Sequence, residues 1–165
     1  MKKLRIQIKK ELNKPSTLSC TREDGSLTYS KLQVDFEIHD IAHYVVERHL
    51  GFKNAFYGLL TQGYQINDFM LPKEQRPESL QPQNLPSEAL VTEHLVNLLT
   101  IDFMQSEDGM DILEMFKIIL FENKLPFPEN FTTENLVGIK KDLKILMKKW
   151  NGIEVGESLE LVFEM

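Results

Sequence analysis

The chain has 165 residues, of which 42% are hydrophobic and 27% are charged. It is therefore long enough for one globular domain that folds without disulfides or metal ions. Its formal net charge of -6 argues against a nucleic-acid partner, which requires a basic surface. The single cysteine, Cys20, excludes a disulfide within the chain and a metal site built from several thiolates.

Neither a signal peptide nor a membrane-spanning segment is apparent in the sequence. The opening residues MKKLRIQIKK have the lysines of a signal peptide but lack the apolar run that follows them. No stretch of about 18 apolar residues occurs anywhere in the chain. We therefore expect a cytoplasmic protein with no membrane partner.

Alternating apolar and polar residues predict strands at both ends of the chain. LRIQIK near the start and SLELVFEM at the end alternate with the period of a half-buried strand. Two further strands flank the turn EDG, where Gly25 suits a hairpin. The outward side chains of the first strand are basic and those of the last strand are acidic. We expect these two strands to be antiparallel neighbours, since opposite charges across a strand pair are favourable.

Between the strands, residues 35–151 have the apolar spacing of helices. Helices are predicted at about 35–50, 54–63, 87–105, 108–123 and 133–150. The connection at 65–86 holds four prolines, and we expect it to be irregular, either a binding loop or a passive linker. With a sheet from residues 1–32 and 157–165, the pattern predicts a single α+β domain spanning 1–165. In this domain a small antiparallel sheet from both termini packs against about five helices.

The stretch HDIAHYVVERHLG at 39–51 contains three of the four histidines. At about 100° per residue, His39, His43, Glu47 and Asp40 lie within an arc of about 100° on one face of a helix. The apolar residues of the stretch lie on the opposite face. Four side chains that can bind a metal or a proton therefore share one side of this helix.

Such a face suits a divalent metal ion. Imidazoles one turn apart can direct two ring nitrogens at one ion, and Glu47 can add a carboxylate oxygen from the next turn. Two histidines and a carboxylate favour zinc and leave a position for water, although iron or manganese also accept this set. The alternative is an ordinary solvated face of an amphipathic helix. The absence of lysine between Lys31 and Lys53 favours a face that is partly covered.

The same stretch resembles the HExxH signature of zinc peptidases, with Asp40 in the place of the general-base glutamate. His39, His43 and His49 also match the spacing of the three zinc histidines of the metzincin family. That family has a glycine at the position of Val46, which breaks the helix so that the third histidine can turn back. Valine offers no such break, so the helix continues here and His49 stays on the opposite face. We therefore reject the peptidase assignment and keep Asp40 as a residue that orients a ligand or acts as a weak base.

Two later segments contain candidates to complete the site. His94 lies on an apolar stripe of the helix predicted at 87–105, where a buried imidazole is either a satisfied core residue or a fourth metal ligand. Glu93, beside it, is expected to point elsewhere. Tyr57 and Tyr64 can line an apolar pocket and bind a substrate, although core packing explains them equally well. Gly58 predicts the close approach of another backbone segment.

Residues 21–69 resemble a group of uncharacterised bacterial proteins that combine a DGS hairpin, an HDxxHYxVE helix and a segment of glycines and aromatics. The matching elements here are EDGSLTYSKL, HDIAHYVVE and LGFKNAFYGLLTQGY. The resemblance implies that His39, Asp40, His43 and Glu47 belong together, and it implies no reaction.

Two hypotheses for the function follow from these patterns. The first is a protein that binds zinc or another divalent metal and that can act as a metal-dependent hydrolase on a small molecule or peptide. The second is a non-enzymatic interaction domain whose polar helix face is only solvated surface. The sequence leaves the substrate and the oligomeric state open.

Overall fold

The computed structural model describes residues 1–105 and 110–165. Four strands form one antiparallel sheet in the order β3-β2-β1-β4. The strands are β1 (Lys3–Lys9), β2 (Thr17–Arg22), β3 (Leu27–Lys31) and β4 (Ser158–Glu164). In β1, β2 and β4 every second side chain faces the core, as the alternating sequence predicts.

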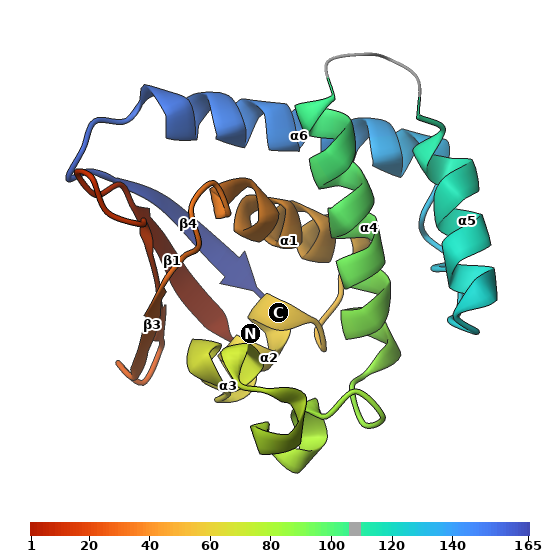
Figure 1. Cartoon of the computed structure of the whole chain (residues 1–165), viewed down its shortest axis with the longest axis horizontal. Coiled ribbons are helices and arrows are strands. Elements are labelled where there is room, and N and C mark those ends of the chain that lie inside the picture. The colour runs from red at the N-terminus through yellow and green to blue at the C-terminus, as the bar shows by residue number, and fades with distance from the viewer. Residues whose placement is uncertain (106–109) are drawn as a thin grey trace.

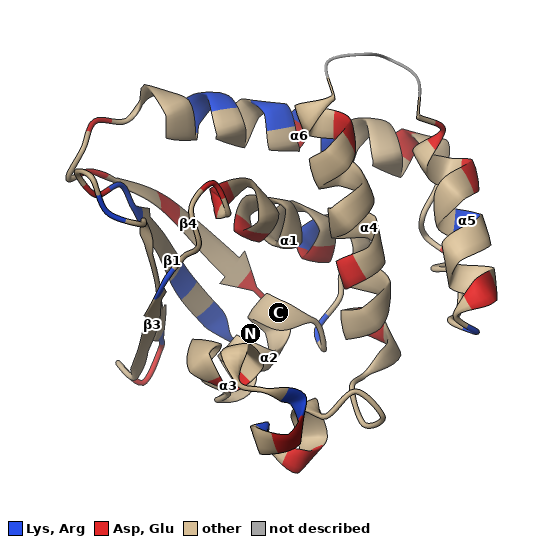
Figure 2. Ribbon diagram, in the orientation of Figure 1, with Lys and Arg blue, Asp and Glu red and all other residues tan. Residues whose placement is uncertain are grey.

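The two ends of the chain pair with each other at one side of this sheet, where β4 forms the edge and β1 lies next to it. β1 pairs with β4 along its whole length, from Lys3 opposite Glu164 to Lys9 opposite Ser158. Figure 2 shows the basic residues of β1 and the acidic residues of β4, and one such pair, Lys3 and Glu164, lies at 2.7 Å. The predicted pairing of the terminal strands is confirmed. Because the charged pair is exposed, it contributes little to stability, and the register is set by the buried residues of the two strands.

The helical part of the chain contains six α-helices and two short 3-10 helices within the described residues. They are α1 (Glu37–Leu50), α2 (Phe56–Gln62), α3 (Ile66–Met70), η1 (Lys73–Gln75), η2 (Glu78–Leu80), α4 (Ser87–Met104), α5 (Ile112–Glu122) and α6 (Thr133–Gly152). The connection at 65–86, expected to be irregular, thus holds one short helix and two 3-10 turns. Residues 108 and 109, at the predicted start of the fifth helix, lie outside the described residues.

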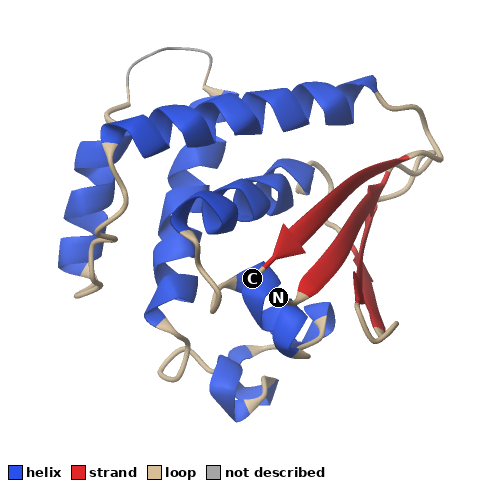
Figure 3. Ribbon diagram, turned by 180° about the vertical axis from the view of Figure 1, so that it is seen from behind, coloured by secondary structure: helices blue, strands red, loops and turns tan. Residues whose placement is uncertain are grey.

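Helix α1 lies at the centre of the fold. Figures 1 and 3 show it between the sheet and α4, and α6 packs against it. Gly51 ends α1 in the left-handed conformation, with φ of 66°, which glycine adopts without strain. Ten of the 14 residues of α1 are buried, so both its apolar and its polar faces are covered by other elements. The structure is therefore α+β, as predicted.

The described part of the chain contains no helix that is both long enough and apolar enough to cross a lipid bilayer.

Candidate metal centre

The polar face of α1 is buried rather than solvated. Asp40, His43 and Glu47 are 6%, 3% and 0% exposed. Helix α2 covers the Glu47 end of this face, and α4 covers the histidines. Burying these groups is costly unless each one has a polar partner. The partners of each side chain therefore indicate what this face does.

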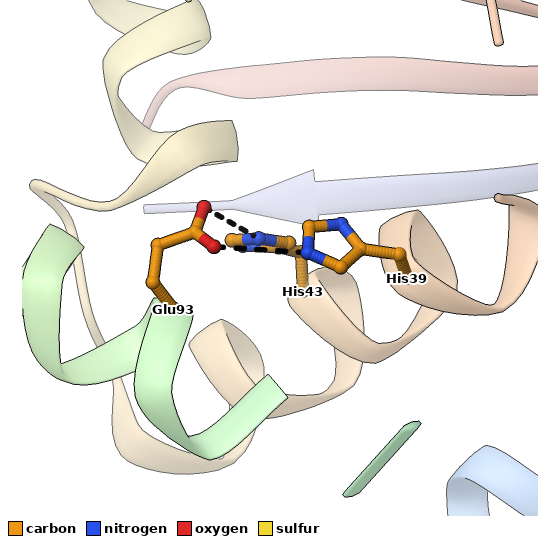
Figure 4. A group of neighbouring side chains, drawn as sticks. All are labelled: His39, His43 and Glu93. Carbon is orange, nitrogen blue, oxygen red and sulfur yellow. Dashed lines mark ion pairs between the residues drawn. The ribbon is translucent and has the colours of Figure 1, made fainter. Parts of the chain in front are cut away.

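Three side chains on this face converge on one point. His39 and His43 on α1 and Glu93 on α4 each offer one atom that can bind a metal, and these atoms lie within 4.8 Å of one another. Figure 4 shows Glu93 reaching across from α4 to both imidazoles. Its carboxylate oxygens lie 3.2 Å from Nε2 of His43 and 3.7 Å from Nε2 of His39. The structure therefore brings together three residues that can hold a metal ion.

Glu47 lies on the other side of His43 from this cluster. Its Oε1 is 3.3 Å from Nδ1 of His43. A carboxylate at Nδ1 favours the tautomer with the proton on that nitrogen, which leaves Nε2 free to bind a metal. The sequence placed Glu47 on the correct face as a metal ligand. In the structure it instead supports His43 from behind, and Glu93 supplies the carboxylate of the cluster.

Glu47 also holds the first turn of α2. Its carboxylate accepts hydrogen bonds from the backbone N–H groups of Tyr57, at 2.9 Å, and Gly58, at 3.1 Å. These N–H groups have no partner within their own helix, and a carboxylate is favourable at this end of a helix. Glu47, which is fully buried, thus contacts both the ring of His43 and the first turn of α2, so the orientation of this ring depends on the position of α2.

Gly58 permits this close packing. A Cβ atom added at this position would lie 2.2 Å from the backbone oxygen of Lys53. The close backbone approach predicted from the sequence is confirmed. We expect Gly58→Ala to lower the free energy of unfolding by about 1–3 kcal/mol, because backbone must move to admit the methyl group. Gly152→Ala is the control, since nothing lies within 4 Å of its added Cβ. Equal urea midpoints for the two variants would contradict the prediction.

The cluster perturbs the proton affinity of His43 strongly. Burial by itself lowers the pKa of this imidazole, but the hydrogen bonds and charges of Glu47 and Glu93 outweigh burial and raise the pKa to about 10. Burial raises the pKa of Glu93, and its hydrogen bonds to the two histidines reverse that effect and hold the pKa well below its usual range. Burial raises the pKa of Glu47, against the opposing effect of its three N–H donors.

Aromatic rings flank both imidazoles. Phe36 stacks on His39 with ring centroids 4.4 Å apart, and Phe56 lies 5.5 Å from His43. The side chain of His43 is 4% exposed and that of His39 is 16% exposed, whereas Glu93 is 51% exposed. The cluster is therefore closed by protein around His43 and open to solvent at Glu93.

The expectation that Glu93 points away from the site is wrong. His94 was the predicted fourth ligand, but it is half-buried and is not part of the cluster. The prediction assumed that α4 buries the stripe that contains His94 and Ile101, whereas Ile101 is 43% exposed. Apolar residues occur nearly all round this helix, so the sequence does not fix which side faces α1.

Asp40 is buried beside the cluster without joining it. Its Oδ2 has no hydrogen-bond partner among the described residues, so this oxygen does not orient either histidine. Burial raises its pKa to about 7, the charge of His43 opposes the rise, and the charges of Glu93 and Glu37 add to it. Asp40 thus carries a buried carboxyl that is expensive to ionise.

We expect Asp40→Asn to stabilise the fold by about 1–3 kcal/mol near pH 8 and by less near pH 5. An unfolded aspartate titrates near pH 3.9, so between about pH 4 and 7 the folded protein binds a proton that the unfolded chain does not. Stability therefore falls as the pH rises through this window, and asparagine removes the loss. Urea unfolding at both pH values, with a chelator present, measures the effect. A gain that is the same at both pH values would contradict this account.

The remaining predicted residues are engaged within the fold. Tyr57 is fully buried and donates its hydroxyl to the backbone oxygen of Asp40 at 3.2 Å. Tyr64 donates its hydroxyl to Ser79 at 2.8 Å. His49 lies apart from the cluster and contacts Asp142 of α6 at 2.9 Å, as its helical phase predicts. Burial raises the pKa of the Cys20 thiol, which argues against a nucleophilic role.

Comparison of the chain with protein-family models, with curated proteins and with solved structures gave no match.

Proposed function

We propose that this protein binds a divalent metal ion, zinc in the first place, through His39, His43 and Glu93. The observation that carries the proposal is the convergence of their three ligand atoms within 4.8 Å, from two helices distant in sequence. Two imidazole nitrogens and a carboxylate are a common ligand set for zinc. Iron and manganese accept the same donors.

The distances support a metal with short bonds. In a tetrahedral zinc site with bonds of about 2.0 Å, neighbouring ligand atoms lie about 3.3 Å apart. His43 Nε2 lies 3.2 Å from Oε1 of Glu93, and His39 Nε2 lies 3.7 Å from Oε2 of Glu93. One ligand atom from each of the three residues lies within 4.8 Å of the other two. Zinc binding therefore requires the side chains of His39 and Glu93, which are partly exposed, to rotate toward His43.

The support behind His43 also fits a metal centre. Histidines that bind metals commonly donate their second ring nitrogen to a carboxylate, which fixes the ring and increases its basicity. Glu47 occupies this position. It is held in turn by two backbone N–H groups, so the ring of His43 is oriented before any metal arrives.

Three protein ligands leave a fourth zinc position for water, which is the arrangement of hydrolytic zinc sites. The proposed reaction class is hydrolysis of a small molecule or peptide. Such a substrate would approach from the side of Glu93, where the cluster meets solvent. Asp40 has no established contact with this side, so the proposal assigns it no catalytic step.

A second candidate function uses the same contacts without a metal. A protonated His43 between Glu47 and Glu93 is a buried ion-pair network that fixes α1 against α2 and α4. The protein would then be an interaction domain, and the network would only stabilise its fold. The two candidates differ in whether the purified protein carries a metal.

Metal analysis of protein purified without a histidine tag tests the proposal. We expect close to one zinc per chain, and we expect His43→Ala and Glu93→Gln to lose it. His94→Ala is the matched control, because His94 is adjacent to Glu93 but outside the cluster, and this variant should keep its zinc. Protein that contains no metal, and whose melting temperature does not rise when zinc is added, would refute the proposal and favour the ion-pair network.

A further inference from the structure

We propose that the candidate metal centre takes an uncharged carboxylic ester or amide with an apolar acyl group, and that it discriminates against phosphate esters. This inference rests on the proposed function and narrows its substrate class. Two features of the cluster carry it. Aromatic rings adjoin both histidines, and within residues 1–105 and 110–165 no lysine or arginine forms an ion pair with the cluster.

An exposed aromatic ring borders the cluster where it meets solvent. Glu93 is 51% exposed, and the ring of His39 next to it is in contact with Phe36. Phe36 directly precedes α1 and stacks on His39 with ring centroids 4.4 Å apart. It is nevertheless 39% exposed, so part of this ring is free to contact a bound molecule. An aromatic side chain in this position favours an apolar group beside the ligand histidines.

The aromatic contacts continue past the second histidine. The rings of His39 and His43 have centroids 4.8 Å apart, Phe56 lies 5.5 Å from His43, and Phe69 lies 5.1 Å from Phe56. Phe56 and Phe69 are half-buried. Together with Phe36, these residues form a continuous row of five rings, which we call the aromatic row. Aromatic carbon therefore adjoins both ligand histidines.

The charged groups around the cluster are acidic groups and histidines. The ion-pair partners of His39, His43 and Glu93 are one another and Glu47. The pKa values of Asp40, His43, Glu47 and Glu93 are shifted by burial, by hydrogen bonds and by neighbouring carboxylates and histidines. No lysine or arginine is among the causes of these shifts. Basic side chains therefore do not contribute to the charge of this site in the described part of the chain.

Two basic residues in the last turn of α1 and just after it are directed elsewhere. Arg48 and Lys53 both line the cavity beside β4, and Arg48 there contacts the ring and hydroxyl of Tyr44. Proteins commonly bind the negative oxygens of a phosphate ester with arginine or lysine. Around this cluster a phosphate would instead meet carboxylates, which repel it. An uncharged carbonyl compound meets no such repulsion.

The reaction that fits this environment is hydrolysis of a carboxylic ester or amide. Water adds to the carbonyl carbon, and the bond from that carbon to the leaving oxygen or nitrogen breaks. The leaving group takes up a proton that the water gives up. The products are a carboxylic acid and an alcohol or an amine. In this assignment the aromatic row contacts the acyl group, and the histidines and Glu93 hold the metal.

Isothermal titration calorimetry of the zinc-loaded protein tests the substrate class with three small zinc-binding compounds. Phenylacetohydroxamate has an aromatic acyl group, acetohydroxamate lacks the ring, and phenylphosphonate carries the ring on an anionic group. We expect phenylacetohydroxamate to bind about tenfold more tightly than either of the others. Only this compound combines an apolar ring with an acyl group that is uncharged in solution.

Phe36→Ala tests the contribution of the exposed ring. We expect this variant to reduce the preference for phenylacetohydroxamate over acetohydroxamate to about twofold and to leave the affinity for acetohydroxamate unchanged. Phe121→Ala is the matched control, because Phe121 is 85% exposed and lies on α5, and this variant should keep the full preference. Both side chains are exposed, so the fold should tolerate their loss.

The outcomes separate this inference from the proposed function. Protein that binds no zinc would refute both of them. Zinc-loaded protein that binds the two hydroxamates equally, or that prefers phenylphosphonate, would overturn the substrate class while leaving the metal site intact. An unchanged preference in Phe36→Ala would overturn it as well.

Discussion

Glu47→Ala should lower the free energy of unfolding by about 3–5 kcal/mol, the largest loss that we expect from any substitution at the candidate metal centre. Glu47 is 0% exposed and accepts hydrogen bonds from His43, Tyr57 and Gly58. Alanine leaves all three donors buried without an acceptor, and it adds a cavity beneath α2. Urea unfolding of metal-free protein measures the loss.

Two further variants separate structural support from metal binding. Glu93→Ala should destabilise the metal-free protein less than Glu47→Ala does, because Glu93 is partly exposed and its loss leaves only the buried Nε2 of His43 without a carboxylate partner, and yet it should abolish zinc binding. Glu47→Gln keeps the shape of the side chain and should lower the zinc affinity by about 10–100-fold, which is typical for the loss of a carboxylate behind a metal-binding histidine. If Glu93→Ala destabilised the metal-free protein as much as Glu47→Ala, the roles assigned to the two carboxylates would be wrong.

The apparent zinc affinity should rise about tenfold per pH unit from pH 6 to about pH 9. In the metal-free protein the two carboxylates raise the pKa of His43 to about 10, against the opposing effect of burial. The imidazole is therefore protonated at neutral pH, and zinc must displace that proton in order to bind Nε2. A histidine with its ordinary pKa near 6.5 would give an affinity that levels off above pH 7.

Competition with a zinc-binding dye at several pH values measures this slope. A plateau between pH 7 and 9 would show that His43 is not held in its protonated form.

The raised pKa of His43 also makes the stability of the metal-free protein depend on pH, and stability falls over the pH range in which zinc affinity rises. The contribution of His43 to stability is fully present below about pH 6.5 and is lost as the pH rises toward 10.

The sheet could be predicted because its pattern is local. Every second residue of β1 and β4 is buried, and this alternation is visible in the sequence without knowledge of the fold. The charges of the outer face then indicated which strands are neighbours. Two short 3-10 turns within the connection at 65–86 were not predicted, since turns of this length leave no periodic apolar pattern.

The candidate metal centre could be predicted only in part. Helical phase alone places His39 and His43 one turn apart on one face, and the structure does the same. Phase does not say what lies against that face, so it could not show that Glu47 contacts α2 while Glu93 arrives from α4. Those two roles depend on how the helices pack, and the packing of α4 is poorly encoded in a helix that is apolar nearly all round.

The most direct test of the metal site is anomalous diffraction at the zinc absorption edge, from crystals of the protein grown with zinc. We predict one strong anomalous peak about 2.0–2.2 Å from Nε2 of His39, Nε2 of His43 and a carboxylate oxygen of Glu93. His43 should keep its Nδ1 contact with Glu47 in that structure. A peak elsewhere, or no peak between these three side chains at saturating zinc, would contradict the proposed site.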